Sequence, residues 1–317
     1  MQIISGTEQF ELEQPSAVAI GKFDGMHRGH KALLSQILEA KSDGFSAVVF
    51  TFEPSPAAFF SGKPVKGLTT RDEKRRLFRQ MGIDVLVEFP LNERTAAILP
   101  ETFVRDILCG RMKARLVAAG ADLSFGDRGT GDAALLQRLS GECGYRVRVI
   151  DKVMQDGEEI SSTRVRRAVE AGRMEEATAL LGDPYAVMGT VAHGRRIGRT
   201  IGFPTVNLMP PKDKLLPPNG VYRSQVECRM GVFESITNVG TKPTVEHGEH
   251  PPMSVETYLY GFNGDMYDSF ITVRLLSFLR PERKFSGLDE LKEQLQRDIR
   301  EAFGDVNLNH TSDGKHS

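Results

Sequence analysis

Short apolar runs alternate with segments of helical periodicity through the first 183 residues of the chain. The apolar runs, each short enough for a buried strand, cover residues 17–20, 46–52, 83–89 and 115–119. The segments expected to be helical are residues 31–42, 70–81, 100–108 and 174–181. Strands that alternate with helices indicate an α/β domain, with a parallel sheet covered on both faces.

The pattern changes near Asp183, where strands begin to follow one another directly. Apolar stretches expected to be strands cover residues 185–190, 221–229, 232–239, 255–262 and 270–279. Consecutive strands without helices favour an antiparallel barrel or sandwich. Ser286 and Asp289 are expected to cap a last helix, whose apolar face would cover the barrel. We therefore expect two domains, residues 1–183 and 184–305, followed by a flexible tail over residues 306–317.

The amino-acid composition argues against some classes of binding partner. The chain has 41 Lys and Arg against 42 Asp and Glu, so its net charge of −1 creates no global attraction for nucleic acid or membranes. No apolar stretch approaches a membrane span, and no signal peptide is recognisable. Cys109, Cys143 and Cys228 lack C-x-x-C spacing, which suits reduced thiols. We expect a cytoplasmic protein without nucleic-acid or membrane partners, whose oligomeric state stays open.

The segment Gly21–His30, G-K-F-D-G-M-H-R-G-H, lies between the first apolar run and the first expected helix. Its glycines allow backbone N–H groups to approach a ligand, and a helix N-terminus favours anions. His27 and His30 are three residues apart, so they would share a face of the first helical turn. Ordinary surface or core histidines are the alternative. Two of the seven histidines within one glycine-rich turn favour a site for phosphate transfer.

Two further clusters follow in the first half. The loop over residues 120–131, which contains Asp122, follows a strand and holds four glycines, so it is either a ligand-shaped loop or an ordinary turn. Ser162 is expected to cap the next helix. Thr163 and Arg166 would then point together from the first turn as an anion clamp. For this cluster the alternative is a capped surface helix.

The segment Gly189–Asn207 is dense in glycine and polar residues. It contains no G-x-x-x-x-G-K-[ST] pattern, so kinase chemistry here would not use a P-loop. A different loop could close over nucleotide phosphates at Gly194, Gly198 and Gly202. Thr205 and Asn207 are two residues apart, so they would face the same way in an extended segment. Their neutral oxygens suit Mg²⁺ that is shared with phosphate groups.

Glu256 alternates with Val255 and Thr257 in an expected strand, so it would lie on the face opposite that apolar set. A solvated glutamate is the alternative, and is the common fate of Glu in a strand. His247 and His250 lie in the segment E-H-G-E-H-P-P, with no Cys or further His nearby. A surface loop is therefore favoured over a metal site.

These motifs, taken together, resemble known enzyme modules. G-x-F-D-G-x-H-x-G-H resembles the H-x-G-H signature of nucleotidylyltransferases. Together with the G-x-D-x-x-F-G loop and I-S-S-T-x-x-R, it resembles the adenylyltransferase module of bacterial FAD synthetases. G-F-P-T-x-N resembles riboflavin kinases, as do N-V-G-x-x-P-T, V-E-T and L-R-P-E-R-K-F. Over nearly its whole length, the chain thus resembles the bifunctional riboflavin kinase/FAD synthetase family of bacteria.

This resemblance implies a Rossmann-like nucleotidylyltransferase domain, followed by a six-stranded antiparallel β-barrel with a terminal helix. It implies phosphorylation of riboflavin to FMN by ATP in the barrel, and adenylylation of FMN by ATP to FAD, with release of pyrophosphate, in the N-terminal domain. ATP is then a substrate, Mg²⁺ a cofactor, and FMN and FAD are products. One alternative is a riboflavin kinase with a weakened adenylyltransferase domain, and another is a flavin-binding protein without activity.

The resemblance also implies roles for individual residues. His27, His30 and Arg166 would stabilise charge during adenylyl transfer, and Glu256 would be the general base of the kinase. ATP in the adenylyltransferase would contact Gly21, Phe23, Asp24, Gly25, His27, His30, Asp122, Ser162, Thr163 and Arg166. ATP in the kinase would contact Gly194, Gly198, Gly202, Thr205 and Asn207, and the last two would also hold Mg²⁺. The chain departs from the family at Ser55, commonly His, and at Asp268, usually Gly.

Overall fold

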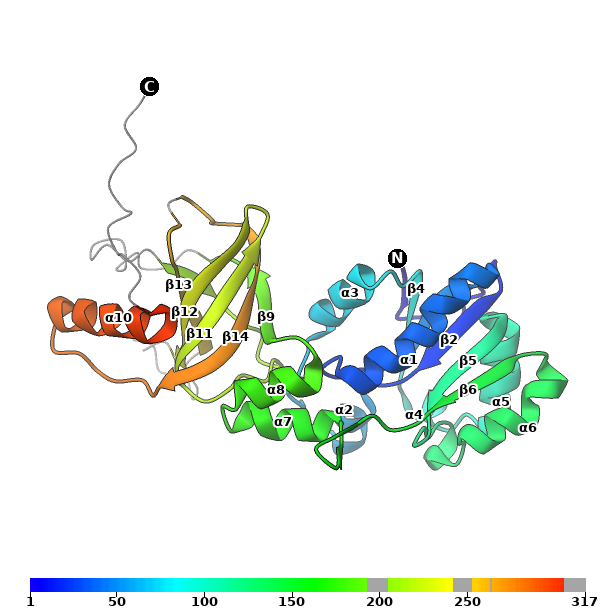
Figure 1. The fold of residues 1–317 in the computed structure, drawn as a ribbon. Coiled ribbons are helices and arrows are strands. Elements are labelled where there is room, and N and C mark those ends of the chain that lie inside the picture. The colour runs from blue at the N-terminus through cyan, green and yellow to red at the C-terminus, as the bar shows by residue number, and fades with distance from the viewer. Residues whose placement is uncertain (193–204, 242–252, 263, 305–317) are drawn as a thin grey trace, which may run out of the picture. The chain divides into compact units, whose positions relative to one another are not determined.

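The computed structural model describes residues 1–192, 205–241, 253–262 and 264–304 (Figure 1). The chain forms two compact units, Met1–Ser162 and Thr163–Ser317. Each unit contains its own six-stranded sheet, one parallel and one antiparallel. The expected combination of an α/β half and a β half is confirmed.

The first sheet is parallel throughout, with the strand order β1-β4-β3-β2-β5-β6. Its strands are β1 (Gln2–Ser5), β2 (Ser16–Ile20), β3 (Ser46–Glu53), β4 (Val85–Pro90), β5 (Ala114–Gly120) and β6 (Arg146–Ile150). Strand β2 is fully buried and pairs with β3 on one side and β5 on the other. The chain moves outward from β2 and later returns to its other side, so the carboxyl end of β2 is a topological switch point.

Helices pack on both faces of this sheet. On one face, Leu34 of α1 and Phe78 of α3 join a buried apolar cluster. On the other face, Leu136 of α6 and Phe103 join a second cluster. The described helices of this unit are α1 (Arg28–Glu39), α2 (Pro56–Ser61), α3 (Arg71–Gln80), α4 (Glu93–Ala96), α5 (Pro100–Thr102) and α6 (Ala133–Cys143), with 3₁₀ turns at Ala40–Asp43 and Asp127–Gly129.

The helix expected over residues 100–108 is not a single α-helix. It begins as α5 and continues as a π-helix over Phe103–Arg111. At its end the backbone N–H of Met112 donates to the carbonyl of Ile107 at 2.9 Å, which spans five residues. A short apolar pattern does not distinguish this wider winding from an α-helix, so packing within the core decides between them.

Several elements were not predicted. They include edge strands β1 and β6, helices α2, α4 and α6, and the two-stranded hairpin of β7 (Met154–Gln155) and β8 (Glu158–Glu159). Strand β6 is only half-buried or exposed along its length, so it shows no continuous apolar run. Edge strands of this kind are recognised by their pairing with a neighbour, which is a long-range contact.

The second sheet is antiparallel throughout, with the order β10-β13-β12-β11-β14-β9. Its strands are β9 (Tyr185–Thr190), β10 (Thr205–Leu208), β11 (Gly220–Cys228), β12 (Gly231–Thr241), β13 (Met253–Leu259) and β14 (Phe270–Arg280). Just beyond β9, the backbone N–H of Ala192 donates to the carbonyl of Asn207 on β10 at 2.8 Å. The two ends of the sheet therefore approach each other, and the sheet curls into a half-barrel.

Within the described residues, the helices of the second half are α7 (Ser162–Glu170), α8 (Met174–Leu181) and α10 (Leu288–Phe303). Helix α8 packs against β9 and β14, and Ile299 of α10 packs with Ile236 of β12. The terminal helix expected from the sequence is thus confirmed. No helix within the described ranges combines the length and the apolar character that crossing a membrane requires.

The expected cap of α10 is wrong by one residue. Gly287 occupies the N-cap position and makes no side-chain capping bond. The backbone N–H and the hydroxyl of Ser286 instead both donate to the carboxylate of Glu290, each at 2.8 Å. Gly287 adopts the extended conformation that the cap position requires. Ser286, one residue earlier, stabilises the helix start through its bonds to Glu290.

Successive side chains of β13 point alternately to the buried face and to the opposite face of the sheet. Thr257 is fully buried in a chain of hydroxyl groups, in which its Oγ1 lies 2.9 Å from that of Thr237, which in turn lies 2.7 Å from the hydroxyl of Ser224. Glu256 points to the other face with Tyr258, which packs against the α10 cluster. The predicted separation of Glu256 from the Val255–Thr257 face is confirmed.

Candidate active sites

The segment Gly21–His30 leaves the sheet at the carboxyl end of β2 and leads directly into α1. This end of β2 is the switch point of the parallel sheet, where open α/β sheets bind their ligands. His27 is the N-cap of α1, so the motif ends at a helix N-terminus, which favours anions. The predicted strand–turn–helix arrangement is therefore confirmed.

The two histidines come together as their spacing predicts. Their rings stack, with centroids 3.7 Å apart and an interplanar angle of 21°. Nδ1 of His27 accepts the backbone N–H of His30 at 3.3 Å, so the neutral ring carries its proton on Nε2. Nδ1 of His30 is buried and has no hydrogen-bond partner among the described residues. A buried nitrogen of this kind indicates a place where a ligand completes the hydrogen bonding.

Both imidazoles are neutral at pH 7. Burial lowers the pKa of His27 to about 4, although the negative charges of Asp24, Glu159 and Asp122 oppose this shift. Burial, assisted by the neighbouring His27 ring, lowers the pKa of His30 well below its usual value of 6.5. Two stacked rings resist double protonation because like charges repel at this distance. A bound triphosphate would favour the cationic form of either ring, since its charge is opposite.

This pKa shift predicts a loss of stability in acid. The unfolded chain binds more protons than the folded chain between pH 6.5 and about 4, because the folded pKa of His27 is the lower one. The contribution is complete above pH 6.5 and is lost as the pH falls through about 4. We expect the thermal midpoint to decrease over this range, and a His27→Gln/His30→Gln variant to decrease less. Equal pH dependence in calorimetry of the two proteins would contradict the prediction.

Small residues and one aromatic ring support the histidines. Phe23 is fully buried, and its ring centroid lies 5.3 Å from that of His30. A Cβ at Gly29 would lie 3.1 Å from Nδ1 of His27, and a Cβ at Gly21 would lie 3.0 Å from the Phe23 ring. Both glycines therefore leave room for the rings. Direct contacts of Gly21 and Phe23 with ATP stay predictions.

Asp24 and Gly25 form the turn that precedes the histidines. The hydroxyl of Ser162 donates to the carbonyl of Asp24 at 2.8 Å, and Oδ1 of Asp24 accepts the backbone N–H of Thr69 at 3.2 Å. Helix α7 begins at Ser162 itself, so the helix does not start after a Ser162 cap. Ser162 and Asp24 thus hold the loop together, and their contacts with ATP stay predictions.

Charged residues surround this motif. Asp122 is exposed on the loop after β5, close enough for its charge to act on His27. Lys152 lies 3.9 Å from Asp122 and donates to Glu159 at 2.7 Å. Thr163 and Arg166 lie on α7 in the second unit, so their approach to the histidines stays a prediction.

A large pocket in the same unit was not predicted from the sequence. Its walls include the aromatic side chains of Phe52, Phe60, Phe89, Phe103 and Phe125. Lys22, the neighbour of Gly21, and Arg128 add positive charge to the lining. Aromatic faces with nearby cations suit a flat aromatic ring that carries an anionic group. The signal in the sequence was the presence of Phe52 and Phe89 at the carboxyl ends of two strands.

Ser55, the departure from the family pattern, is the N-cap of α2. Its hydroxyl accepts the backbone N–H of Ala58 at 3.3 Å. The next two residues, Pro56 and Ala57, line the aromatic pocket. The serine therefore has a clear local role at the start of a helix beside this pocket, and its effect on ATP binding stays a prediction.

The second site lies on the half-barrel, where Asn207 of β10 pairs directly with Glu256 of β13. Paired residues of antiparallel strands project from the same face, with Cβ atoms about 4.5–5.5 Å apart. Thr205 lies two residues before Asn207 and shares this face. Asn238 of β12 is the partner of Glu256 on its other side. The structure thus brings the three predicted kinase residues together and adds Asn238, which the sequence marks only through N-V-G-x-x-P-T.

The side chain of Asn207 meets the requirements of a cation ligand. The residue is 8% exposed, and its Oδ1 is buried without a hydrogen-bond partner among the described residues. No group of three or more His, Cys, Asp or Glu side chains in the described ranges could hold a metal ion. A hard cation that takes neutral oxygens and phosphate oxygens is the kind of ion that fits this site.

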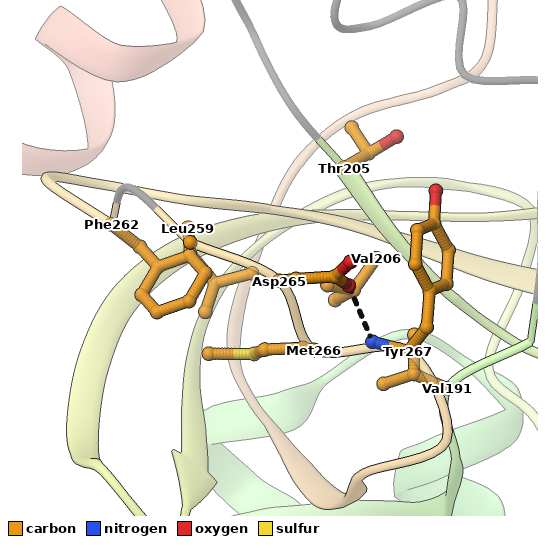
Figure 2. A pocket seen from close by; sticks show the side chains of 9 residues that line it. Val191, Thr205, Val206, Leu259, Phe262, Asp265, Met266 and Tyr267 are labelled. Carbon is orange, nitrogen blue, oxygen red and sulfur yellow. Dashed lines mark hydrogen bonds between the residues drawn. The ribbon is translucent and has the colours of Figure 1, made fainter.

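Thr205 also lines a small pocket at the same end of the half-barrel, shown in Figure 2. Apolar side chains including Val206, Leu259 and Met266 form much of its wall. Oδ1 of Asp265 accepts the backbone N–H of Tyr267 at 2.9 Å and holds the loop that closes the pocket. The predicted Mg²⁺ residue Thr205 is therefore next to a cavity.

Asp268, the second departure from the family pattern, follows this loop. Its φ of +61° lies in the left-handed region, which glycine adopts without steric cost and aspartate tolerates better than most residues. Its backbone N–H donates to the carbonyl of Val191 at 3.2 Å. This conformation would suit the glycine that the resemblance implies for the family, and the turn is formed here with aspartate.

Several predicted residues lie outside the described ranges. They are Gly194, Gly198 and Gly202 of the glycine-rich segment, and His247 and His250 of the E-H-G-E-H-P-P segment. Their proposed roles rest on the sequence alone.

Comparisons with known proteins assign each half of the chain to a family. Residues 9–164 match the family model for FAD synthetase, and residues 181–304 match that for riboflavin kinase. The bifunctional riboflavin kinase/FMN adenylyltransferase of Bacillus subtilis is 34% identical, over 92% of this chain and 93% of its own. The Escherichia coli K12 enzyme of the same name is 35% identical, over 96% and 98%.

A solved structure from Streptococcus pneumoniae, described as a macrolide-efflux protein, has the same architecture. Its TM-score is 0.80 at 29% sequence identity, covering 94% of this chain and 97% of the other. Similarity over nearly the whole chain, with a separate match for each half, leads to one conclusion. The chain belongs to the family of bifunctional riboflavin kinase/FMN adenylyltransferases.

Proposed function

We propose that the chain makes FAD in two steps, each at one of the two sites described above. The half-barrel phosphorylates riboflavin, and the parallel-sheet unit transfers an adenylyl group to the resulting FMN. The supporting observation is that each family match contains its own candidate site for phosphate groups. Stacked histidines lie in one match and the Asn207–Glu256 pair lies in the other.

In the kinase step, the ribityl 5′-hydroxyl of riboflavin attacks the γ-phosphorus of ATP, and ADP leaves. Glu256 takes the hydroxyl proton, so that no positive charge builds up on the attacking oxygen as the bond to phosphorus forms. Asn207 and Thr205 would hold Mg²⁺ through their amide and hydroxyl oxygens, and the cation would offset the charge of the phosphates. The orphaned Oδ1 of Asn207 supports this arrangement.

In the adenylyltransferase step, a phosphate oxygen of FMN attacks the α-phosphorus of ATP, and pyrophosphate leaves. The phosphate is already an adequate nucleophile, so no general base is required. Nε2–H of His27 donates to a phosphate oxygen, while His30 and Arg166 complete the stabilisation of the developing charge. Support comes from the stacked rings at the helix N-terminus.

The aromatic pocket beside the histidine motif would receive the isoalloxazine ring of FMN. Its phenylalanine faces can stack on the flat ring system, and Lys22 can pair with the FMN phosphate. Lys22 directly follows Gly21, so the phosphate would be held close to the histidines where ATP is expected. This arrangement supplies the proximity that the transfer requires.

Residues 1–183 and 184–305 are proposed as the two catalytic domains. Because α8 packs against β9 and β14, cleavage near residue 183 would separate contacting elements. Variants of the full chain therefore test the independence of the activities better than fragments do. A cytoplasmic location is proposed from three free cysteines, Cys109, Cys143 and Cys228.

Chromatography of the products formed from riboflavin, ATP and MgCl₂ tests this proposal. The expected result is FMN followed by FAD, and FAD alone when FMN replaces riboflavin. Accumulation of FMN without FAD would favour a kinase with a weakened adenylyltransferase domain. Absence of both products from a folded protein would favour a flavin-binding protein without activity.

Asn207→Leu tests the cation site, because it removes the amide oxygen at similar volume. We expect the Mg²⁺ concentration required for riboflavin phosphorylation to increase at least roughly tenfold. Loss of a group that supports a metal site typically costs about 10–100-fold in metal affinity. The thermal shift that Mg²⁺ and ADP together produce should also decrease. FAD formation from supplied FMN should not change, and Asn219→Leu serves as a matched control. An unchanged Mg²⁺ requirement would remove Asn207 from the site.

A further inference from the structure

We propose that Thr69 is a positioning residue for adenylyl transfer, acting through the loop that carries the histidines. The residues around it, Gly67–Thr70, are called the clamp segment here. Neither residue composition nor motif spacing marks this segment as part of a site. The proposal rests on the proposed role of His27 and His30, and identifies what holds their loop in place.

The loop before His27 has an unusual backbone. Phe23 and Met26 adopt left-handed conformations, with φ of +50° and +47°, and Gly25 lies between them with φ of +87°. Left-handed conformations of residues other than glycine raise the energy of a loop and persist only when surrounding contacts enforce them. Both strained residues are fully or almost fully buried. A specific support for this turn is therefore required.

The clamp segment provides that support through two hydrogen bonds. The backbone N–H of Thr69 donates to Oδ1 of Asp24 at 3.2 Å, and its hydroxyl accepts the backbone N–H of Gly25 at 3.2 Å. One residue thus binds both members of the turn. Leu68 packs beneath it so closely that a Cβ at Gly25 would lie 2.7 Å from Leu68 Cδ1.

The clamp segment is itself anchored to the sheet by α3. Thr70 is the N-cap of this helix and forms a capping box with Glu73, with bonds of 2.8 and 3.2 Å. Phe78 of the same helix packs edge-to-face on Phe23, at a centroid distance of 5.6 Å. The histidine loop is therefore held against one rigid helix at both its turn and its aromatic ring.

Displacement of this turn would move His27, which follows Met26 and supplies the hydrogen bond that caps α1. A shift of about 1 Å in a reactive arrangement can reduce the rate about a hundredfold, even when the altered residue does not touch the substrate. Thr69 thus affects catalysis without contact with ATP. We expect its loss to reduce kcat for FAD formation more than it raises KM for FMN.

The test compares Thr69→Val, Thr69→Ser and Gly67→Ala in the full chain. Thr69→Val removes the hydroxyl at similar volume, and Thr69→Ser retains it. Gly67→Ala leaves Thr69 intact but places a Cβ 2.7 Å from the Thr69 carbonyl oxygen, so it displaces the clamp segment by another route. Thr7→Val is the matched control, because the hydroxyl of Thr7 bonds only locally to Gln9 at 3.0 Å.

FAD formation from FMN and ATP is measured well below the thermal midpoint, with riboflavin phosphorylation as the internal control of folding. Thr69→Val and Gly67→Ala should each lower kcat roughly ten- to a hundredfold, while Thr69→Ser stays near the parent. Riboflavin phosphorylation should be unchanged in all variants. Parental kcat in a folded Thr69→Val protein, or equal losses in the Val and Ser variants, would overturn the proposal.

A His27→Ala protein in the same assay distinguishes failure of the clamp proposal from failure of the proposed role of the histidines. If His27→Ala is inactive while Thr69→Val and Gly67→Ala are fully active, only the clamp proposal fails. If His27→Ala retains FAD formation, the proposed role of the histidine motif fails as well. If Thr69→Val does not fold, the Gly67→Ala result decides alone.

Discussion

Glu256→Gln should reduce riboflavin phosphorylation by at least about a hundredfold, because loss of a general base costs roughly 10²–10⁴ in rate. The amide keeps the size of the side chain and part of its hydrogen bonding, but it cannot accept the hydroxyl proton. Glu256 lies opposite Asn207 and outside the buried hydroxyl chain of the half-barrel, so the change should leave the packing intact. Product chromatography with riboflavin and ATP measures the effect.

FAD formation from supplied FMN is the internal control and should remain at the parental rate. Glu227→Gln is a matched variant, since Glu227 lies on β11 and pairs with Arg274 at 2.6 Å, away from Asn207. A structural glutamate would behave differently, because its loss would lower the thermal midpoint and slow phosphorylation only through unfolding. Near-parental phosphorylation by folded Glu256→Gln would mean that another residue takes the proton.

His27→Ala or His30→Ala should suppress FAD formation and leave FMN formation nearly intact. Loss of one preorganised group that stabilises the transition state typically costs about 2.7–4 kcal/mol, or roughly 10²–10³ in rate. Removal of His27 also deletes the acceptor for the backbone N–H of His30 at the start of α1. We therefore expect His27→Ala to have a lower thermal midpoint than His30→Ala. Initial rates with FMN and ATP measure the catalytic effect.

His310→Ala is the matched control and should have no effect on either activity, because His310 lies outside both family matches. His27→Asn distinguishes the two roles of His27, because asparagine is a good N-cap but lacks the imidazole. It should recover thermal stability without recovering FAD formation. If the double alanine variant made FAD within a few-fold of the parent, the histidine pair would not be part of the adenylyltransferase site.

Interactions within one helical turn or one strand could be predicted from the sequence. The helix expected from residue 70 begins with a local capping box between Thr70 and Glu73, and His27 and His30 meet because they are three residues apart at a helix start. Glu256 lies on the face that alternation along its strand requires. In each case the periodicity of the backbone brings the partners together, so a short segment contains all the information.

Contacts between distant segments were decided by the tertiary structure. Asn207 faces Glu256 only through the register of β10 on β13, and a slip of one residue would turn Asn207 to the opposite face. Thr69 reaches the turn at Asp24 because α3 packs beside α1 on the same sheet. Hydrophobic periodicity determines which face a side chain occupies. Strand pairing and packing determine which neighbour it meets there, and both proposed sites depend on that choice.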